Sequence, residues 1–81
     1  MRGASAVIPR RALLTAPQTE VLRLYAMGLS TAQAAEAMGI GPGEVRAHLR
    51  AAVRAFGAAS PIHALVLAYR AGLIELPGRQ R

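Results

Sequence analysis

The sequence has no cysteine, no lysine and no aspartate, and its 81 residues hold ten arginines and four glutamates, for a formal net charge of +6 at pH 7. The absence of cysteine excludes a disulfide framework, a thiolate nucleophile and a cysteine-ligated zinc site, and it fits a reducing cytosol. A chain this short buries only about 60–70% of the surface that its unfolded form exposes. We therefore expect one small domain, without room for a large catalytic architecture.

Long apolar runs are also missing. No stretch approaches the roughly 20 uninterrupted apolar residues that a membrane helix needs, because arginine, glutamine or glutamate interrupts every candidate. The apolar run near the N-terminus is too short for a secretory signal, so we take Met1 as the native start. With 53% hydrophobic residues, the chain is too apolar to be disordered. These features predict a soluble cytoplasmic protein that does not enter a membrane.

Aromatic residues are few, namely Tyr25, Phe56 and Tyr69, and no valine- or threonine-rich run alternates apolar and polar positions. Strands are therefore disfavoured. Alanine supplies much of the apolar content and has the highest helix propensity. The composition predicts an all-α fold.

Glycines and capping residues divide the chain into four expected helices. Thr15 with Gln18, and Ser30 with Gln33, have the spacing of capping boxes. Prolines stand in three of the expected first turns, where a missing N–H is harmless. The four helices are expected to open at Thr15, Ser30, Gly41 and Ser60 and to close before Gly28, Gly39, Gly57 and Gly72.

Helical spacing assigns an inward face to each helix. The expected core residues are Val21, Leu22, Leu24, Tyr25, Ala35, Met38, Val45, Leu49, Ala52, Val53, Phe56, Ile62, Leu65, Val66 and Tyr69. Alanines dominate where the second and third helices must meet, which allows a close crossing. A short glycine-containing turn followed by a longer, more basic helix is typical of a helix-turn-helix, although ordinary helical hairpins share this pattern.

From Leu14 to Ile74 the chain resembles the LuxR-type DNA-binding domain, also called GerE- or NarL-type. The matching stretches are LTAPQTEVLRLYAMGLS, AAEAMGI, EVRAHLRAAVRAFGAAS and HALVLAYRAGLI. The resemblance implies a tetrahelical domain over residues 14–74, in which the second and third helices form the helix-turn-helix. Residues 1–13 would then be a flexible basic arm, and residues 75–81 a short tail.

The same resemblance implies partners and site residues. The partners are double-stranded DNA and a second copy of the chain, paired through the fourth helix, in the cytoplasm at the nucleoid. No cofactor is implied. The expected base-reading residues are Arg46, Ala47 and Arg50, the phosphate-contacting residues are Thr31, Gln33, His48, Arg54 and Ser60, and the dimer residues are Leu67, Arg70, Ala71 and Ile74.

An arginine row supports the base-reading positions independently. Arg46, Arg50 and Arg54 recur every four residues, so they are expected along one helix face, opposite Val45, Leu49 and Val53. Arginine can donate two hydrogen bonds to guanine in the major groove, and an alanine such as Ala47 can contact a thymine methyl. The alternative is an ordinary solvated face of a protein whose only basic residue is arginine.

Several departures from the family pattern leave a second function open. Gly41 and Glu44 replace a serine cap and a threonine at the start of the third helix, and Glu44 would repel a phosphate while capping that helix. Residues 14–74 hold five arginines and three glutamates, so their net charge is only +2 and most of the excess lies at the two ends. The alternatives are a protein-interaction module that docks on RNA polymerase or another regulator, and nonspecific coating of DNA.

Other constellations indicate structure rather than chemistry. His48 and His63 stand on different expected helices without a carboxylate at ligand spacing, so no metal site is expected. The serines lack the partners of a catalytic triad, and we expect no enzymatic activity. Glu20 is expected to pair with an arginine such as Arg54. The apolar row on the fourth helix exceeds what one core face needs, which favours self-association.

Overall fold

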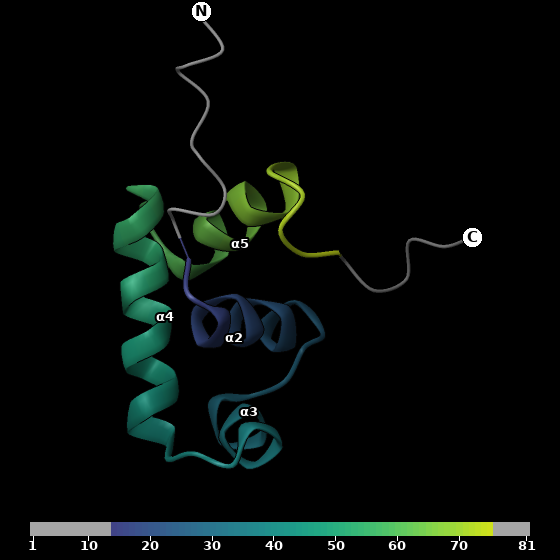
Figure 1. The fold of residues 1–81 in the computed structure, drawn as a ribbon, viewed down its shortest axis with the longest axis vertical. Coiled ribbons are helices and arrows are strands. Elements are labelled where there is room, and N and C mark those ends of the chain that lie inside the picture. Colours follow the sequence, from purple (N-terminus) through teal and green to yellow (C-terminus); the bar gives the residue numbers. More distant parts are fainter. Residues whose placement is uncertain (1–13, 76–81) are drawn as a thin grey trace, which may run out of the picture.

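The computed structural model describes residues 14–75, and within that range the chain forms four helices and no strand (Figure 1). The helices are α2 (Ala16–Ala26), α3 (Thr31–Met38), α4 (Pro42–Phe56) and α5 (Pro61–Arg70). The all-α prediction is confirmed. The expected basic arm over residues 1–13 and the tail beyond Glu75 lie outside the described residues.

Local sequence sets the starts of α2 and α3 as expected. The Thr15 hydroxyl accepts a hydrogen bond from the Gln18 N–H at 3.2 Å, and the Gln18 side-chain oxygen accepts one from the Thr15 N–H at 3.0 Å. Ser30 and Gln33 form the same reciprocal pair at 3.1 and 2.8 Å. Each pair satisfies two backbone donors that have no partner inside the helix.

The start of α4 is capped differently, because Gly41 at the N-cap has no side chain. There only one half of the reciprocal pair is present: the Glu44 carboxylate accepts a hydrogen bond from the Gly41 N–H at 3.1 Å, as Gln18 and Gln33 do from their N-cap residues. The predicted bounds of α3 and α4 are confirmed, whereas α2 and α5 each end one residue earlier than expected, with Met27 and Ala71 as their C-caps. At Gly57 the chain leaves α4 with a φ of 63°, a conformation that glycine adopts without strain.

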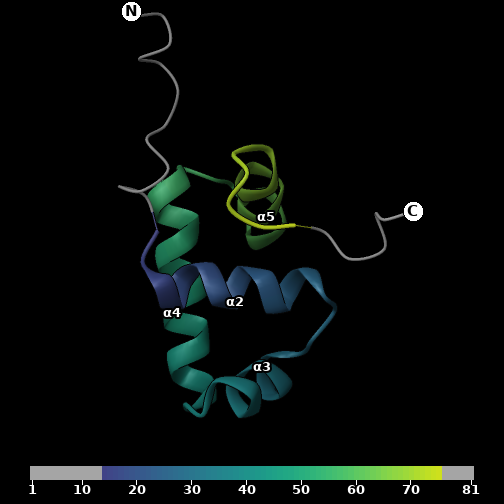
Figure 2. The same cartoon turned by 45° about the vertical axis from the view of Figure 1, so that its right-hand side comes forward.

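Helix α4 is central to the fold and packs against all three other helices. Helix α2 crosses its middle, α3 lies near its first turns and α5 near its last turns, an arrangement that both views show (Figures 1 and 2). In Figure 1 the other three helices lie on one side of α4, so the opposite side has no helix over it.

The core consists of two clusters of buried residues bridged by half-buried Leu49, which packs against both. The α3 cluster joins α2, α3 and α4 and consists of Val21, Leu24, Ala34, Ala35 and Val45. The α5 cluster joins α2, α4, α5 and the segment after α5 and consists of Leu22, Ala52, Phe56, Ala64, Leu65, Ala68 and Ile74. Small alanines at both crossings let the helix backbones approach closely, as expected for α3 and α4.

Part of the predicted core is wrong. Tyr25, Ile62 and Val66 are 37%, 59% and 41% exposed, and the buried face of α5 consists of the predicted Leu65 together with Ala64 and Ala68, which were not predicted. From hydrophobicity, the larger apolar side chains of α5 were expected in the core. Because α5 crosses α2 and α4 closely, the smaller side chains are the ones that fit there. Met38, Leu49, Val53 and Tyr69 are half-buried at the edges of the clusters.

Within residues 14–75 no single helix has the length and hydropathy to cross a membrane. Only α4 and α5 taken together reach that length, as a pair bent by 61° at the break between them.

Candidate nucleic-acid interface

Helix α4 carries a row of exposed arginines. Each residue advances about 100° around a helix, so residues four apart remain within about 40° of each other. Arg46, Arg50 and Arg54 are all exposed, as is Ala47 beside them, whereas the buried residues of α4 are Val45, Ala52 and Phe56. The three predicted base-reading residues, Arg46, Ala47 and Arg50, therefore share one solvent-facing surface.

The expectation that the apolar residues of α4 lie opposite the arginine row is wrong for two of them. Leu49 and Val53 do not lie opposite the arginine row but line a single groove with it, because Val53 is only about 20° around the helix from Arg46. The groove has a volume of about 460 Å³ and runs between α4 and the start of α5. Its lining residues are Arg46, Leu49, Arg50, Val53, Arg54, Ala59, Ser60 and Pro61.

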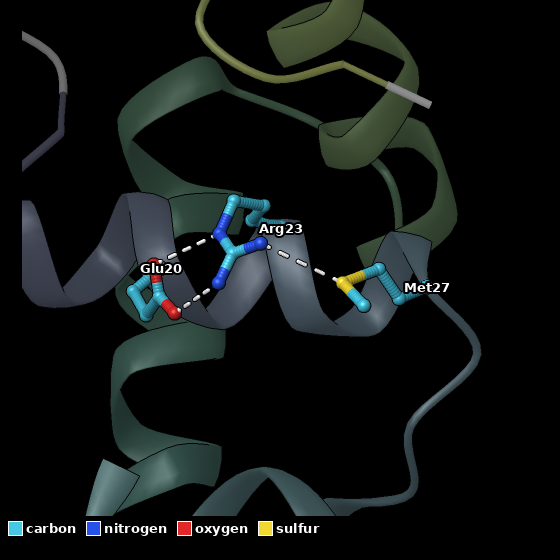
Figure 3. A network of polar contacts seen from close by, with 3 residues as sticks. All are labelled: Glu20, Arg23 and Met27. Atoms are coloured by element: carbon cyan, nitrogen blue, oxygen red, sulfur yellow. Dashed lines mark hydrogen bonds and ion pairs between the residues drawn. The ribbon is translucent and has the colours of Figure 1, made fainter. Parts of the chain in front are cut away.

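Glu20 does not neutralise the positive charge of the arginines in this groove. Its carboxylate binds Arg23 on its own helix, with an Oε2 to Nη2 distance of 2.6 Å and an Oε1 to Nε distance of 3.0 Å (Figure 3). Glu20 therefore pairs with an arginine, as expected, but the partner is Arg23, one turn along α2, and not Arg54. The hydrogen bonds from Arg23 lower the pKa of Glu20, and those to Glu20 raise the pKa of Arg23.

The charges on α4 consequently have no acidic partner in the described chain. Across residues 14–75 the one ion pair is that of Glu20 with Arg23, so Arg46, Arg50 and Arg54 have no carboxylate within 4 Å. Like charges at this spacing repel by a few tenths of a kcal/mol per pair. A polyanion against this face would convert that repulsion into attraction.

The predicted phosphate-contacting residues divide into two groups. Arg54 and Ser60 meet in the groove, where Ser60 is the N-cap of α5 and its hydroxyl accepts from the His63 N–H at 3.1 Å. Thr31 and Gln33 stand in the first turn of α3, outside the groove. His48 is half-buried and lies about 200° around α4 from Arg46, away from the arginine row.

The predicted dimer residues also differ in exposure. Arg70 is exposed, Leu67 and Ala71 are half-buried, and Ile74 is only 5% exposed because it belongs to the α5 cluster. The large apolar side chains that α5 exposes are Ile62 and Val66, four residues apart on one face. Both residues were assigned to the core from sequence, and both are exposed on α5.

Sequence reasoning missed half of the groove. Leu49 and Val53 could have been found, since each stands within one residue of an arginine of the row on a helix whose bounds were predicted correctly. Ala59 and Pro61 carried no such signal, because only the angle between α4 and α5 brings them to this surface.

The remaining polar residues have structural partners. The Nδ1 of His63 accepts a hydrogen bond from the Ala59 N–H at 3.0 Å, which holds the loop before α5. No group of three histidine, aspartate or glutamate residues that could bind a metal ion occurs between residues 14 and 75. Ser30 and Ser60 both act as helix caps.

Comparison with known proteins agrees with this architecture. Residues 12–68 match the family model of the bacterial regulatory proteins of the luxR family. The fold is similar to a solved structure of transcription factor GerE, with a TM-score of 0.75 and 24% sequence identity over 78% of this chain and 94% of that one. No curated protein matches the chain significantly. Because the family model covers most of its length, the chain belongs to the LuxR family of bacterial regulatory proteins.

Proposed function

We propose that this protein is a sequence-specific DNA-binding transcriptional regulator that acts as a homodimer and inserts α4 into the major groove. The exposed arginine row of α4, which has no acidic partner among residues 14–75, is the main support for this function. Membership of a family of DNA-binding regulators supports the same function.

Base reading is assigned to Arg46, Ala47 and Arg50. The major groove is about 12 Å wide and accepts one helix, and α4 has 15 residues, or about 22 Å of length, to lie in it. Arg46 and Arg50 can each donate two hydrogen bonds to a guanine, and Ala47 can pack against a thymine methyl. Helix α4 packs against the three other helices, which places the backbone that carries these side chains.

Phosphate contacts are assigned to residues flanking the base-reading surface. Arg54 follows Arg50 by one turn, and Ser60 lies across the groove from α4 with its hydroxyl hydrogen available to donate. Gln33 accepts from Ser30 through its oxygen, so its amide hydrogens remain available beside Thr31 at the start of α3. His48 lies off the arginine face and would reach the backbone only at the flank of α4.

Dimerisation is assigned to α5. Leu67, Arg70 and Ala71 present partly or fully exposed surface there, and the exposed Ile62 and Val66 extend its apolar area. Ile74 would support this surface from inside the core rather than contact a partner. Two protomers related by a two-fold axis would address half-sites about one helical turn, or about 34–36 Å, apart.

A titration of the full chain against DNA at several salt concentrations tests the proposal. Binding to a random duplex should weaken steeply as salt rises, because each neutralised phosphate releases counterions. Binding to a selected site should remain tighter than to the random duplex at every salt concentration. Equal affinities for both duplexes would leave only nonspecific coating, and a flat, negligible response would exclude DNA as the partner.

A second candidate function is a protein-interaction module that docks on RNA polymerase or another regulator. Glu44 favours it, since an exposed carboxylate at the start of α4 would repel a phosphate. Yet Glu44 has a structural role as the only side-chain cap of α4, where Gly41 offers none. We therefore prefer the DNA-binding function and expect Glu44 to reduce affinity rather than abolish it.

A further inference from the structure

The groove between α4 and the start of α5 is more than a row of charges. Four of its lining residues, Leu49, Val53, Ala59 and Pro61, are apolar, and its volume is about 460 Å³. Binding sites for small molecules are typically about 300–1,000 Å³, mostly apolar, with a few polar groups that fix the ligand. We propose that this groove binds a small amphipathic anion, a carboxylate carried on an alkyl or aryl body.

The charges select the sign of the ligand. Arg46, Arg50 and Arg54 line the groove over about 12 Å of α4 and have no carboxylate within 4 Å among residues 14–75. A guanidinium donates two parallel hydrogen bonds to a carboxylate, which fixes the direction of the head group. A cation with the same apolar body would meet three like charges.

The apolar residues select the body of the ligand. Leu49 and Val53 are half-buried, so they pack on the core and still present surface to the groove. An alkyl or aryl chain over them removes apolar area from water, which a bare anion such as acetate cannot do. Tight binding therefore requires the head group and the body on one molecule.

The position of the groove links this ligand to DNA binding. Arg46 and Arg50 are the arginines proposed to read bases, so a ligand that holds them prevents their use on DNA. This regulatory step rests on the proposed function, whereas occupation of the groove does not. The ligand would act as a competitive inhibitor of DNA binding.

Decanoate is a suitable probe, titrated into the isotope-labelled full chain without DNA and followed through backbone amide resonances. We expect saturable shifts centred on Val53, Ala59 and Ser60, with acetate and decyltrimethylammonium binding at least about tenfold more weakly. An absence of saturable shifts would overturn the proposal. Equal binding of the cationic amphiphile would also overturn it, because the arginines would then play no part.

Two exposed variants test the location. Ala59→Glu places a carboxylate at the rim, and Arg54→Gln removes one charge, so each should weaken decanoate binding about fivefold. Ala37→Glu, exposed on α3 outside the groove, is the matched control and should bind within about twofold of the unmodified chain. Unchanged affinity in both groove variants, with folding verified by their amide spectra, contradicts the assignment.

A final arm adds decanoate to a complex of the chain with DNA. An apparent Kd for DNA that rises in proportion to decanoate supports competition. Decanoate bound in the groove with no effect on the Kd overturns the regulatory step alone. If the chain binds no DNA at all, the proposed function fails, and the titration without DNA still decides whether the groove is a ligand site.

Discussion

The Glu44 carboxylate accepts a hydrogen bond from the Gly41 N–H at 3.1 Å, so a residue whose charge is unfavourable for DNA binding holds the start of the proposed recognition helix. Glycine at the N-cap has no side chain to accept from the N–H groups of the first turn, so the bond from the Gly41 N–H to Glu44 is the one half of a capping box that α4 keeps. A negative charge at a helix N-terminus is also favourable for the helix dipole.

Two substitutions distinguish the role of Glu44 as a helix cap from its electrostatic effect on DNA binding. Glu44→Gln keeps an acceptor oxygen and removes the charge, so we expect a change in unfolding free energy within about 0.5 kcal/mol and an affinity for DNA raised about two- to fivefold. Glu44→Ala loses the cap and should cost about 0.5–1.5 kcal/mol in urea unfolding. Unchanged DNA affinity in Glu44→Gln would show that the carboxylate does not approach a phosphate.

Arg50 and Arg54 should differ in their effect on DNA binding. Arg50→Ala is expected to lower affinity for a selected site by about 1–3 kcal/mol and to relax preference at one base pair. Arg54→Ala should weaken binding to every duplex alike and reduce the salt slope by about one. Fluorescence anisotropy with selected and random duplexes measures both, with Arg23→Ala on α2 as the control. Uniform losses for Arg50→Ala would contradict base reading.

Val66 tests the proposed dimer. It is 41% exposed on α5, so Val66→Glu should leave the fold of the protomer intact and shift the chain toward monomer by placing two carboxylates at a two-fold interface. Analytical ultracentrifugation reports the change in mass, and Ala37→Glu on α3 serves as the charge-matched control. The same monomer–dimer distribution in both variants would remove α5 from the interface.

Ala68 tests the close helix crossing. It is fully buried in the α5 cluster, so Ala68→Leu should destabilise the fold by about 1–3 kcal/mol through overpacking. Ala37→Leu, at an exposed position of α3, should change the unfolding free energy by no more than about 0.5 kcal/mol. Denaturant unfolding compares the pair, and tolerance of leucine at position 68 would mean that α5 packs less closely than described.

Glu20 gives stability a small pH dependence. Hydrogen bonding by Arg23 lowers the pKa of Glu20 in the folded state, so this contribution is complete above the pKa of the unfolded carboxyl and disappears as pH falls through the folded value. Glu20→Gln should therefore be slightly less stable than the unmodified chain at neutral pH and equal to it in acid. Both side chains are more than a third exposed, so the difference should be small. A difference that grows in acid would contradict the assigned sign.

Features that depend on neighbouring residues were predictable from sequence. Thr15 with Gln18, and Ser30 with Gln33, determine where helices begin through bonds spanning three residues, and the exposed arginine row follows from the period of α4. Features that depend on how helices cross were not. Ala64 and Ala68 face the core because of the angle at which α5 crosses α2 and α4, and that angle cannot be predicted from sequence.

The sequence also could not show which of several arginines pairs with a given carboxylate. Several arginines were possible partners for Glu20, and only the structure shows that Arg23, three residues away, binds both carboxylate oxygens. The groove was predictable only in part. Its α4 residues follow from sequence, whereas its Ala59–Pro61 side depends on how α5 is placed.

Selection of duplexes from a random pool by the full chain, at a salt concentration that suppresses nonspecific binding, shows whether α4 reads DNA sequence. Reading by Arg46 and Arg50 predicts enrichment of guanine-containing half-sites spaced about one helical turn apart, and loss of one enriched guanine in Arg50→Ala. Recovery of unenriched sequence, with no more DNA retained than on an unrelated protein, would contradict the claim that α4 is a recognition helix.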